Sequence, residues 1–272
     1  MTPSLPADDE HRSGQSDAPP SPPVPTEIPL PLDPRRLAKF FAFVIPLIVI
    51  FGAAANYAVY NLAPDPDHPV ADVLKRFDLG HEPSIPALYS ATVMLMISGV
   101  LLFFGHFDRS DGGRHRRGWL LLAALFLCLG IDEVVMFHEM ANAALERLHL
   151  DGPFYFSWIL PGAIFAATIG LLSLRFLWSL HAVTRRLMVL SGMVFLSGAL
   201  GMEFIAGLIF SAAENEEAAI SSVSHVLIQA VEEGLEMAGM AMFLCALVNH
   251  ARLVGLVISV RDNSSCRSAE TT

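Results

Sequence analysis

Seven carboxylates interrupt segments that are otherwise apolar enough to span a membrane, and two histidines accompany them. These residues are Asp132, Glu133, Glu139, Glu203, Glu232, Glu233 and Glu236, with His138 and His225. No Lys or Arg lies within residues 118–145, 187–212 or 223–249, which contain them. Ionisable groups at membrane depth cost free energy, and they usually face a cavity, a bound ion or a proton path. The pattern therefore predicts an intramembrane site.

A divalent metal ion would supply the positive charge that these segments lack. Carboxylate oxygen and imidazole nitrogen suit iron, manganese and zinc. We expect one of these metals, with ligands from Asp132, Glu139, Glu203, His225, Glu232 and Glu236. His138 and Glu133 are the candidate catalytic acid–base groups, and His138 is also an alternate ligand. None of these acids is followed by a His three residues later, which is the Glu-x-x-His spacing of two-metal helix bundles.

Three classes of function are compatible with such a site. A metal ion with an open position activates water for hydrolysis, or dioxygen for oxidation if it is redox-active. The first hypothesis is a metal-dependent hydrolase or oxidase acting on a lipid or other hydrophobic substrate. The second is a carrier or channel in which the same carboxylates exchange protons or cations. The third is a non-catalytic assembly or sensor subunit whose acids pair with Lys or Arg of another chain.

Composition supports a membrane location. The chain has 272 residues, of which 53% are apolar, and its mean hydropathy is +0.51, which is too high for an ordinary soluble domain. The basic residues form no extended patch, so we expect no nucleic-acid partner. The expected partners are the lipid bilayer and a hydrophobic substrate or cation. The oligomeric state stays open.

Six stretches are long enough to cross a hydrocarbon core, which takes about 20 helical residues. They lie at roughly 38–62, 84–106, 118–145, 154–180, 187–212 and 223–249. Basic residues gather before the first stretch and in alternate loops after it, and such loops are cytoplasmic. The sequence therefore predicts an all-α bundle of six transmembrane helices in a bacterial-type inner (plasma) membrane, with both termini in the cytoplasm.

The two ends of the chain differ from this central region. Residues 1–34 are rich in proline and are predicted to form a disordered cytoplasmic tail. Residues 35–252 form the predicted transmembrane domain, and 253–272 a short cytoplasmic tail.

Helical periodicity predicts which acids share a face. The topology places the acids of three helices in the outer half of the bilayer. If 118–145 is one helix, Asp132 and Glu139 share a face and His138 lies off it. In the last helix, one polar stripe contains His225, Gln229, Glu232 and Glu236. Glu133 and Glu233 point about 100° away from these faces.

Other residues have weaker expected roles. Small residues such as Gly198 and Gly239 predict close packing of the last two helices, with the third helix beside them. Asn56 is a weak candidate for lining the cavity. Trp158 is expected to be an anchor at the membrane interface, as Tyr and Trp near helix ends often are.

Overall fold

The central part of the chain is helical, as predicted. The computed structural model describes residues 26–29, 33–62, 68–81, 83–107, 113–145, 147, 150–255 and 257–260. From 33 to 255, the described residues form helices joined by turns. Two short strands, β1 (Thr26–Pro29) and β2 (Val257–Val260), form a separate antiparallel pair with Thr26 opposite Val260. The predicted tails lie largely outside the described residues.

Within the described residues, five helical segments are long and apolar enough to cross a membrane. They are α1 (Pro34–Asn61), α3 (Ile85–Phe107), α4 (Arg116–Val135), α6 (Ile159–Ser179) and the continuous segment Ala182–Ala212. Large apolar side chains point outward from them; Phe43 is 68% exposed and Leu171 is 73% exposed. Apolar surface on this scale marks contact with lipid or a partner. The chain is an integral multi-pass membrane protein.

The segment Ala182–Ala212 is not a uniform α-helix. It consists of α7 (Ala182–Leu196), the π-helical turn η3 (Ser197–Met202) and α8 (Glu203–Ala212). Such π segments occur inside α-helices, often at functional sites. Here the π turn directly precedes Glu203 and sets the direction of that side chain.

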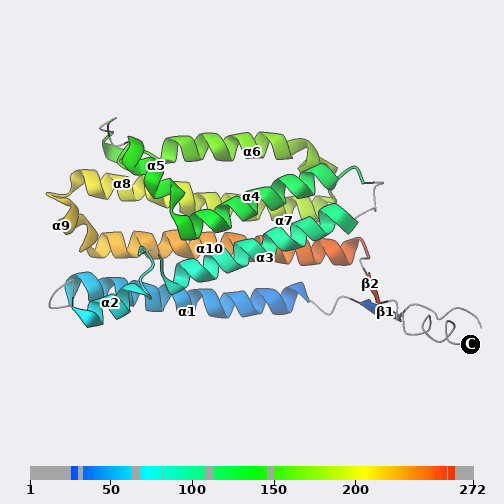
Figure 1. Cartoon of the computed structure of the whole chain (residues 1–272), viewed down its shortest axis with the longest axis horizontal. Helices are drawn as coiled ribbons and strands as arrows, with labels where there is room; N and C mark the ends of the chain where they lie inside the picture. Colours follow the sequence, from blue (N-terminus) through cyan, green and yellow to red (C-terminus); the bar gives the residue numbers. More distant parts are fainter. Residues whose placement is uncertain are drawn as a thin grey trace, which may run out of the picture. The chain divides into compact units, whose positions relative to one another are not determined.

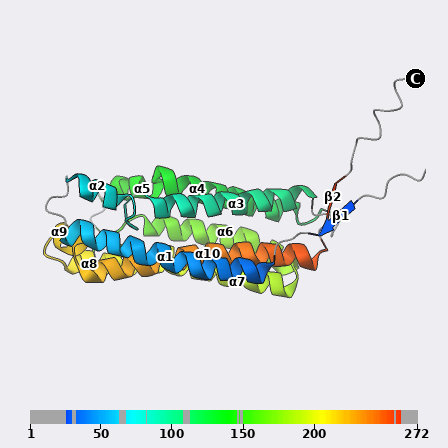
Figure 2. The same ribbon diagram turned by 90° about the horizontal axis from the view of Figure 1, so that it is seen from below.

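The sixth predicted span corresponds to α10 (Val223–Leu253), a helix of 31 residues. It lies between α1 and α7 and also packs on α3, η3 and α8 (Figures 1 and 2). From Met237 to Ala251 most of its side chains are buried. A helix that is apolar around most of its circumference requires such neighbours. Glu232, Glu233 and Glu236 make its first half more polar than the five apolar segments, so its role as a span stays a prediction.

Short helices lie at one end of this bundle. They are α2 (Pro69–Lys75), α5 (Phe137–Leu145) and α9 (Glu216–Ile220), and Figure 1 shows them together with α8 on the left. A 3₁₀ turn, η2 (Gly152–Phe154), packs against α8.

The prediction of one helix over 118–145 is wrong. The helix α4 ends at Val135, and Met136 adopts a left-handed conformation with φ of 59° before α5 begins. A non-glycine residue rarely takes this conformation, because its Cβ crowds the following carbonyl oxygen. The break turns α5 away from the axis of α4, so a helical phase measured across Met136 does not apply.

Candidate functional site

The close approach of α10 to the π turn η3 positions the acids. A Cβ atom on Gly198 would lie 2.7 Å from the Glu232 carbonyl oxygen and 2.9 Å from Glu236 Cγ. Farther along α10, a Cβ on Gly239 would lie 2.7 Å from the Phe195 nitrogen. The predicted tight packing between these two helices is therefore confirmed. The third predicted span, now α4, also reaches α10, since the rings of Phe126 and Phe243 lie 4.7 Å apart.

A pair of carboxyl groups from different helices forms the centre of the site. The side chains of Glu203, the first residue of α8, and Glu232 of α10 lie close enough to share a hydrogen bond. The indole Nε1 of Trp158 donates a second hydrogen bond, of 2.9 Å, to Glu203 Oε1. Two carboxylates cannot pair in this way unless a proton or another cation lies between them. The pair is thus a binding point for positive charge.

Asp132 and His138 form a second pair across the break between α4 and α5. His138 Nδ1 lies 2.9 Å from Asp132 Oδ2, and the His138 backbone N–H donates to Asp132 Oδ1 at 3.2 Å. The expectation that His138 lies off the Asp132 face is therefore wrong, because the break at Met136 brings α5 back over the end of α4. The His138 ring also lies 5.4 Å from the Trp158 ring, which links this pair to Glu203.

These groups surround a pocket of about 780 Å³. Six of the nine acids and histidines singled out from the sequence line it: His138, Glu139, Glu203, His225, Glu232 and Glu233. Its described lining residues include no Lys or Arg. The pocket collects acids and imidazoles from α5, α8 and α10 around one space, so most of the predicted constellation is brought together.

Three of the predicted residues lie behind the pocket wall. Asp132 reaches the pocket through its bond to His138. Glu133 and Glu236 do not line the pocket, although each lies close enough to Glu233 for their charges to repel. Within the described residues, no three His, Cys, Asp or Glu side chains are arranged as ligands of one metal ion.

His225 is the pocket residue with the clearest unused polar atom. Its Nδ1 is buried and has no hydrogen-bond partner among the described residues. Its ring lies 5.2 Å from Phe210, edge to face, and its backbone N–H is bound by the N-cap Ser222. Buried polar atoms are normally hydrogen-bonded, so this nitrogen is available to a ligand.

A polar network that the sequence did not reveal closes one side of the pocket. Asp78, in the turn between α2 and α3, accepts hydrogen bonds from Asn56 Nδ2 at 2.7 Å and from the Gly80 N–H at 3.1 Å. Asn56 also donates to Gln229 Oε1 of α10 at 2.9 Å. Burial raises the pKa of Asp78, and the two hydrogen bonds only partly oppose this effect.

Gly80 allows the turn to lie directly against α10. A Cβ at this position would overlap the Gln229 side-chain amide. A lone acid in a turn gave no reason to single out Asp78, although the Asp-x-Gly sequence 78–80 is typical of a turn. Trp158, expected to be an interfacial anchor, donates a hydrogen bond to Glu203 of the central pair.

Comparison with known protein families identifies the family of this chain. The family described as "Domain of unknown function (DUF8692)" matches residues 41–251. The chain belongs to the DUF8692 family. The matched region begins within α1 and ends within α10, and it includes every residue that lines the acidic pocket. No curated protein and no solved structure matches this DUF8692 chain.

Proposed function

We propose that this DUF8692 protein binds a divalent metal ion in its acidic pocket and uses it to hydrolyse or oxidise a lipid or other hydrophobic substrate. The observation that carries the proposal is the pairing of Glu203 with Glu232, two acids from different helices, in a pocket whose described lining contains no basic side chain. A cation placed at this pair would offset their repulsion.

Several groups near the pair suit the remaining ligand positions. His225, whose Nδ1 has no hydrogen-bond partner among the described residues, and Glu139 both line the pocket. Iron, manganese and zinc accept such nitrogen and oxygen ligands. Because the acids now hydrogen-bond to neighbouring side chains, ion binding would replace these bonds and draw the carboxylates inward.

His138 is suited to the transfer of a proton to or from a substrate. Asp132 contacts its Nδ1 and orients the ring, and His138 lines the pocket. This arrangement, with a carboxylate orienting an imidazole, is common to many general bases. In this proposal Glu133, which does not line the pocket, acts on the site through its charge.

The proposal includes a topology. With α10 as the sixth span and the basic loops in the cytoplasm, both termini are cytoplasmic and the pocket lies in the outer half of a bacterial-type inner (plasma) membrane. A hydrophobic substrate would then enter sideways from the outer leaflet.

Elemental analysis of the purified protein tests the metal site. After reconstitution with iron, manganese or zinc, the wild-type protein should retain about one equivalent or more of one metal, and Glu203→Gln with Glu232→Gln should lose most of it. Glu217→Gln is the matched control, because Glu217 is an exposed acid of α9 outside the pocket lining. Wild-type protein that retains no metal, or a double variant that retains all of it, would contradict the proposal.

A second function is favoured by the positions of the remaining acids. From the pocket residues Glu232 and Glu233, electrostatic contacts continue to the half-buried Glu236 and to Glu133. A row of interacting carboxylates suits a proton or cation path. Flux of protons or Na⁺ into sealed vesicles, abolished by Glu236→Gln and unchanged by Glu217→Gln, would support this alternative over the enzyme.

A further inference from the structure

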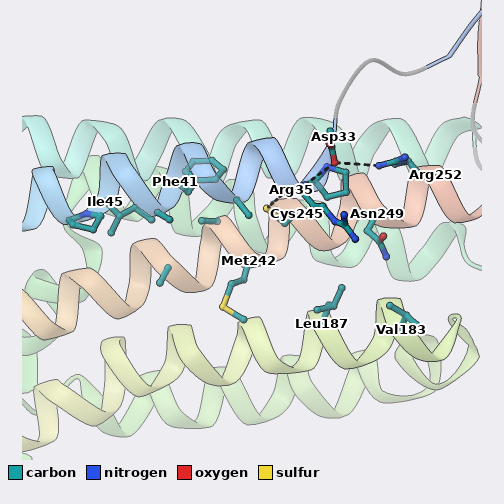
Figure 3. Close-up of a pocket in the computed structure, with 16 residues that line it drawn as sticks. Asp33, Arg35, Phe41, Ile45, Val183, Leu187, Met242, Cys245, Asn249 and Arg252 are labelled. Atoms are coloured by element: carbon teal, nitrogen blue, oxygen red, sulfur yellow. Dashed lines mark hydrogen bonds and ion pairs between the residues drawn. The ribbon is translucent and has the colours of Figure 1, made fainter.

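A second cavity lies at the opposite end of α10 from the acidic pocket. It has a volume of about 1050 Å³ and is bounded by α1, α7 and α10 (Figure 3). The walls are apolar: Phe41 and Ile45 come from α1, and Val183 and Leu187 from α7. We call this cavity the α1–α7 groove. Its volume is at the upper end of the range for ligand sites.

The floor of the groove is a single stripe of α10. Between Met237 and Ala251, the residues that are not buried are Ala238, Met242, Cys245 and Asn249. Their spacing of four, three and four residues places them on one helical face, and all four line the groove. The second half of α10 is therefore fully packed except where it faces this groove.

The groove is apolar along most of its length and charged at one end. Arg35, Arg252 and Asn249 lie at that end with Asp33, whereas Phe41 and Ile45 lie away from it (Figure 3). Arg252 Nη1 is 3.5 Å from Asp33 Oδ1, and the same oxygen accepts the Arg35 backbone N–H at 3.0 Å. Two guanidinium groups against one carboxylate leave net positive charge at this end.

The length of the groove matches one leaflet of a bilayer. The lining residues of α1 extend from Pro34 to Pro46, a rise of about 18 Å at 1.5 Å per residue. A bilayer with its headgroup regions is about 40–45 Å thick, so one leaflet is about 20–22 Å. The charged end therefore lies at headgroup level when the apolar part lies among acyl chains.

We propose that the α1–α7 groove is a binding site for a phospholipid with an anionic headgroup. Its phosphate contacts Arg35 and Arg252, and an acyl chain lies on the stripe formed by Asn249, Cys245, Met242 and Ala238. Arginine suits this role because its planar guanidinium group donates paired hydrogen bonds to phosphate oxygens. The site is separate from the acidic pocket and does not depend on the function proposed for it.

Lipid retention tests the headgroup contact. The full chain is reconstituted in vesicles of equimolar phosphatidylcholine and phosphatidylglycerol, extracted in mild detergent and analysed by native mass spectrometry. Wild-type protein should retain phosphatidylglycerol in preference to phosphatidylcholine, and Arg35→Gln with Arg252→Gln should reduce that preference about tenfold. Arg117→Gln, an exposed arginine of α4 outside the groove, should behave as wild type.

Two results would overturn the headgroup contact. One is equal retention of the two lipids by the wild-type protein, and the other is an unchanged preference in the double variant. Inorganic phosphate is added as a competitor. If phosphate alone removes the bound phosphatidylglycerol, the groove is a site for the free anion instead.

Cysteine labelling tests the position of the acyl chain. Cys245 lies in the floor of the groove, whereas Cys128 is exposed on α4 outside it. In a background with Cys266→Ser, an apolar maleimide should label Cys245 several-fold more slowly in vesicles containing phosphatidylglycerol than in phosphatidylcholine alone. The rate at Cys128 should not change. Equal rates at Cys245 in the two lipids would contradict occupancy of the groove.

Discussion

The first half of α10, from Val223 to Glu236, faces a polar pocket, whereas its second half is buried from Met237 to Ala251 except along one groove. The structures around the two halves also differ. The break at Met136 and the π turn at 197–202 lie around the polar half, while regular stretches of α1, α3 and α7 enclose the other. Irregular backbone thus accompanies the acids, and regular packing accompanies the apolar part.

The largest expected effect comes from adding one methyl group to the apolar half of α10. In Gly239→Ala the new Cβ would lie 2.7 Å from the backbone nitrogen of Phe195, which cannot move without displacing α7. Overpacking of this kind costs about 1–3 kcal/mol. We expect the melting temperature in detergent to fall by about 2–4 °C for each kcal/mol lost.

Gly234→Ala is the matched control in the polar half. Its Cβ would meet only Val49 Cγ2, at an ordinary distance of 3.6 Å. Because alanine favours helix over glycine by about 1 kcal/mol, this variant should be as stable as wild type or slightly more stable. Equal melting temperatures for the two variants would mean that the two halves are packed alike.

Apolar patterning predicted the helices, but it could not predict where their backbones depart from α geometry. The run 118–145 contains no Gly or Pro near Met136, so nothing in it signals the left-handed residue that ends α4. The contact between Asp132 and His138 was missed for this reason. Glu203 and Glu232 were predicted as part of one site, because both are acids within apolar segments. Burying two such acids costs less free energy when they share one cavity and one ion or proton.

Asp78 provides a smaller, pH-dependent test at the edge of the polar half. Its raised pKa means that the folded protein holds a proton on this group more tightly than the unfolded chain does. The stabilising contribution is therefore complete below the ordinary aspartate pKa of about 3.9 and is lost as the pH rises through the raised value.

Asp78→Asn should remove this dependence. The Asn side-chain oxygen can still accept from Asn56 and Gly80, and the new amide group takes the place of Oδ2, which has no hydrogen-bond partner among the described residues. Compared with wild type, the variant should gain melting temperature progressively from pH 4 to pH 8. A constant difference between the two curves would show that Asp78 does not titrate in this range.

The smallest expected effect concerns the break between α4 and α5. Met136→Gly removes the Cβ that is crowded at φ of 59°, so it should stabilise the protein by about 1 kcal/mol or less. Met140→Gly, at an exposed position inside α5, should instead destabilise it by about 1 kcal/mol. Chemical denaturation of both variants measures the difference. A loss of stability in Met136→Gly would show that the Met136 side chain contributes more than its backbone costs.

The π turn between α7 and α8 makes the direction of Glu203 depend on backbone geometry as well as on residue identity. Each π hydrogen bond encloses one more residue than an α-helical bond does. Loss of a single residue between Ser197 and Met202 would allow the segment to continue as a plain α-helix, with its apolar character intact. Because the lost residue would be the one that the π turn accommodates, Glu203 would keep nearly its present direction relative to α7, toward Glu232 and Trp158. If all six residues took α geometry instead, Glu203 would rotate by about 100° relative to α7, so a related chain with a regular helix here would need one residue fewer to keep the carboxyl pair.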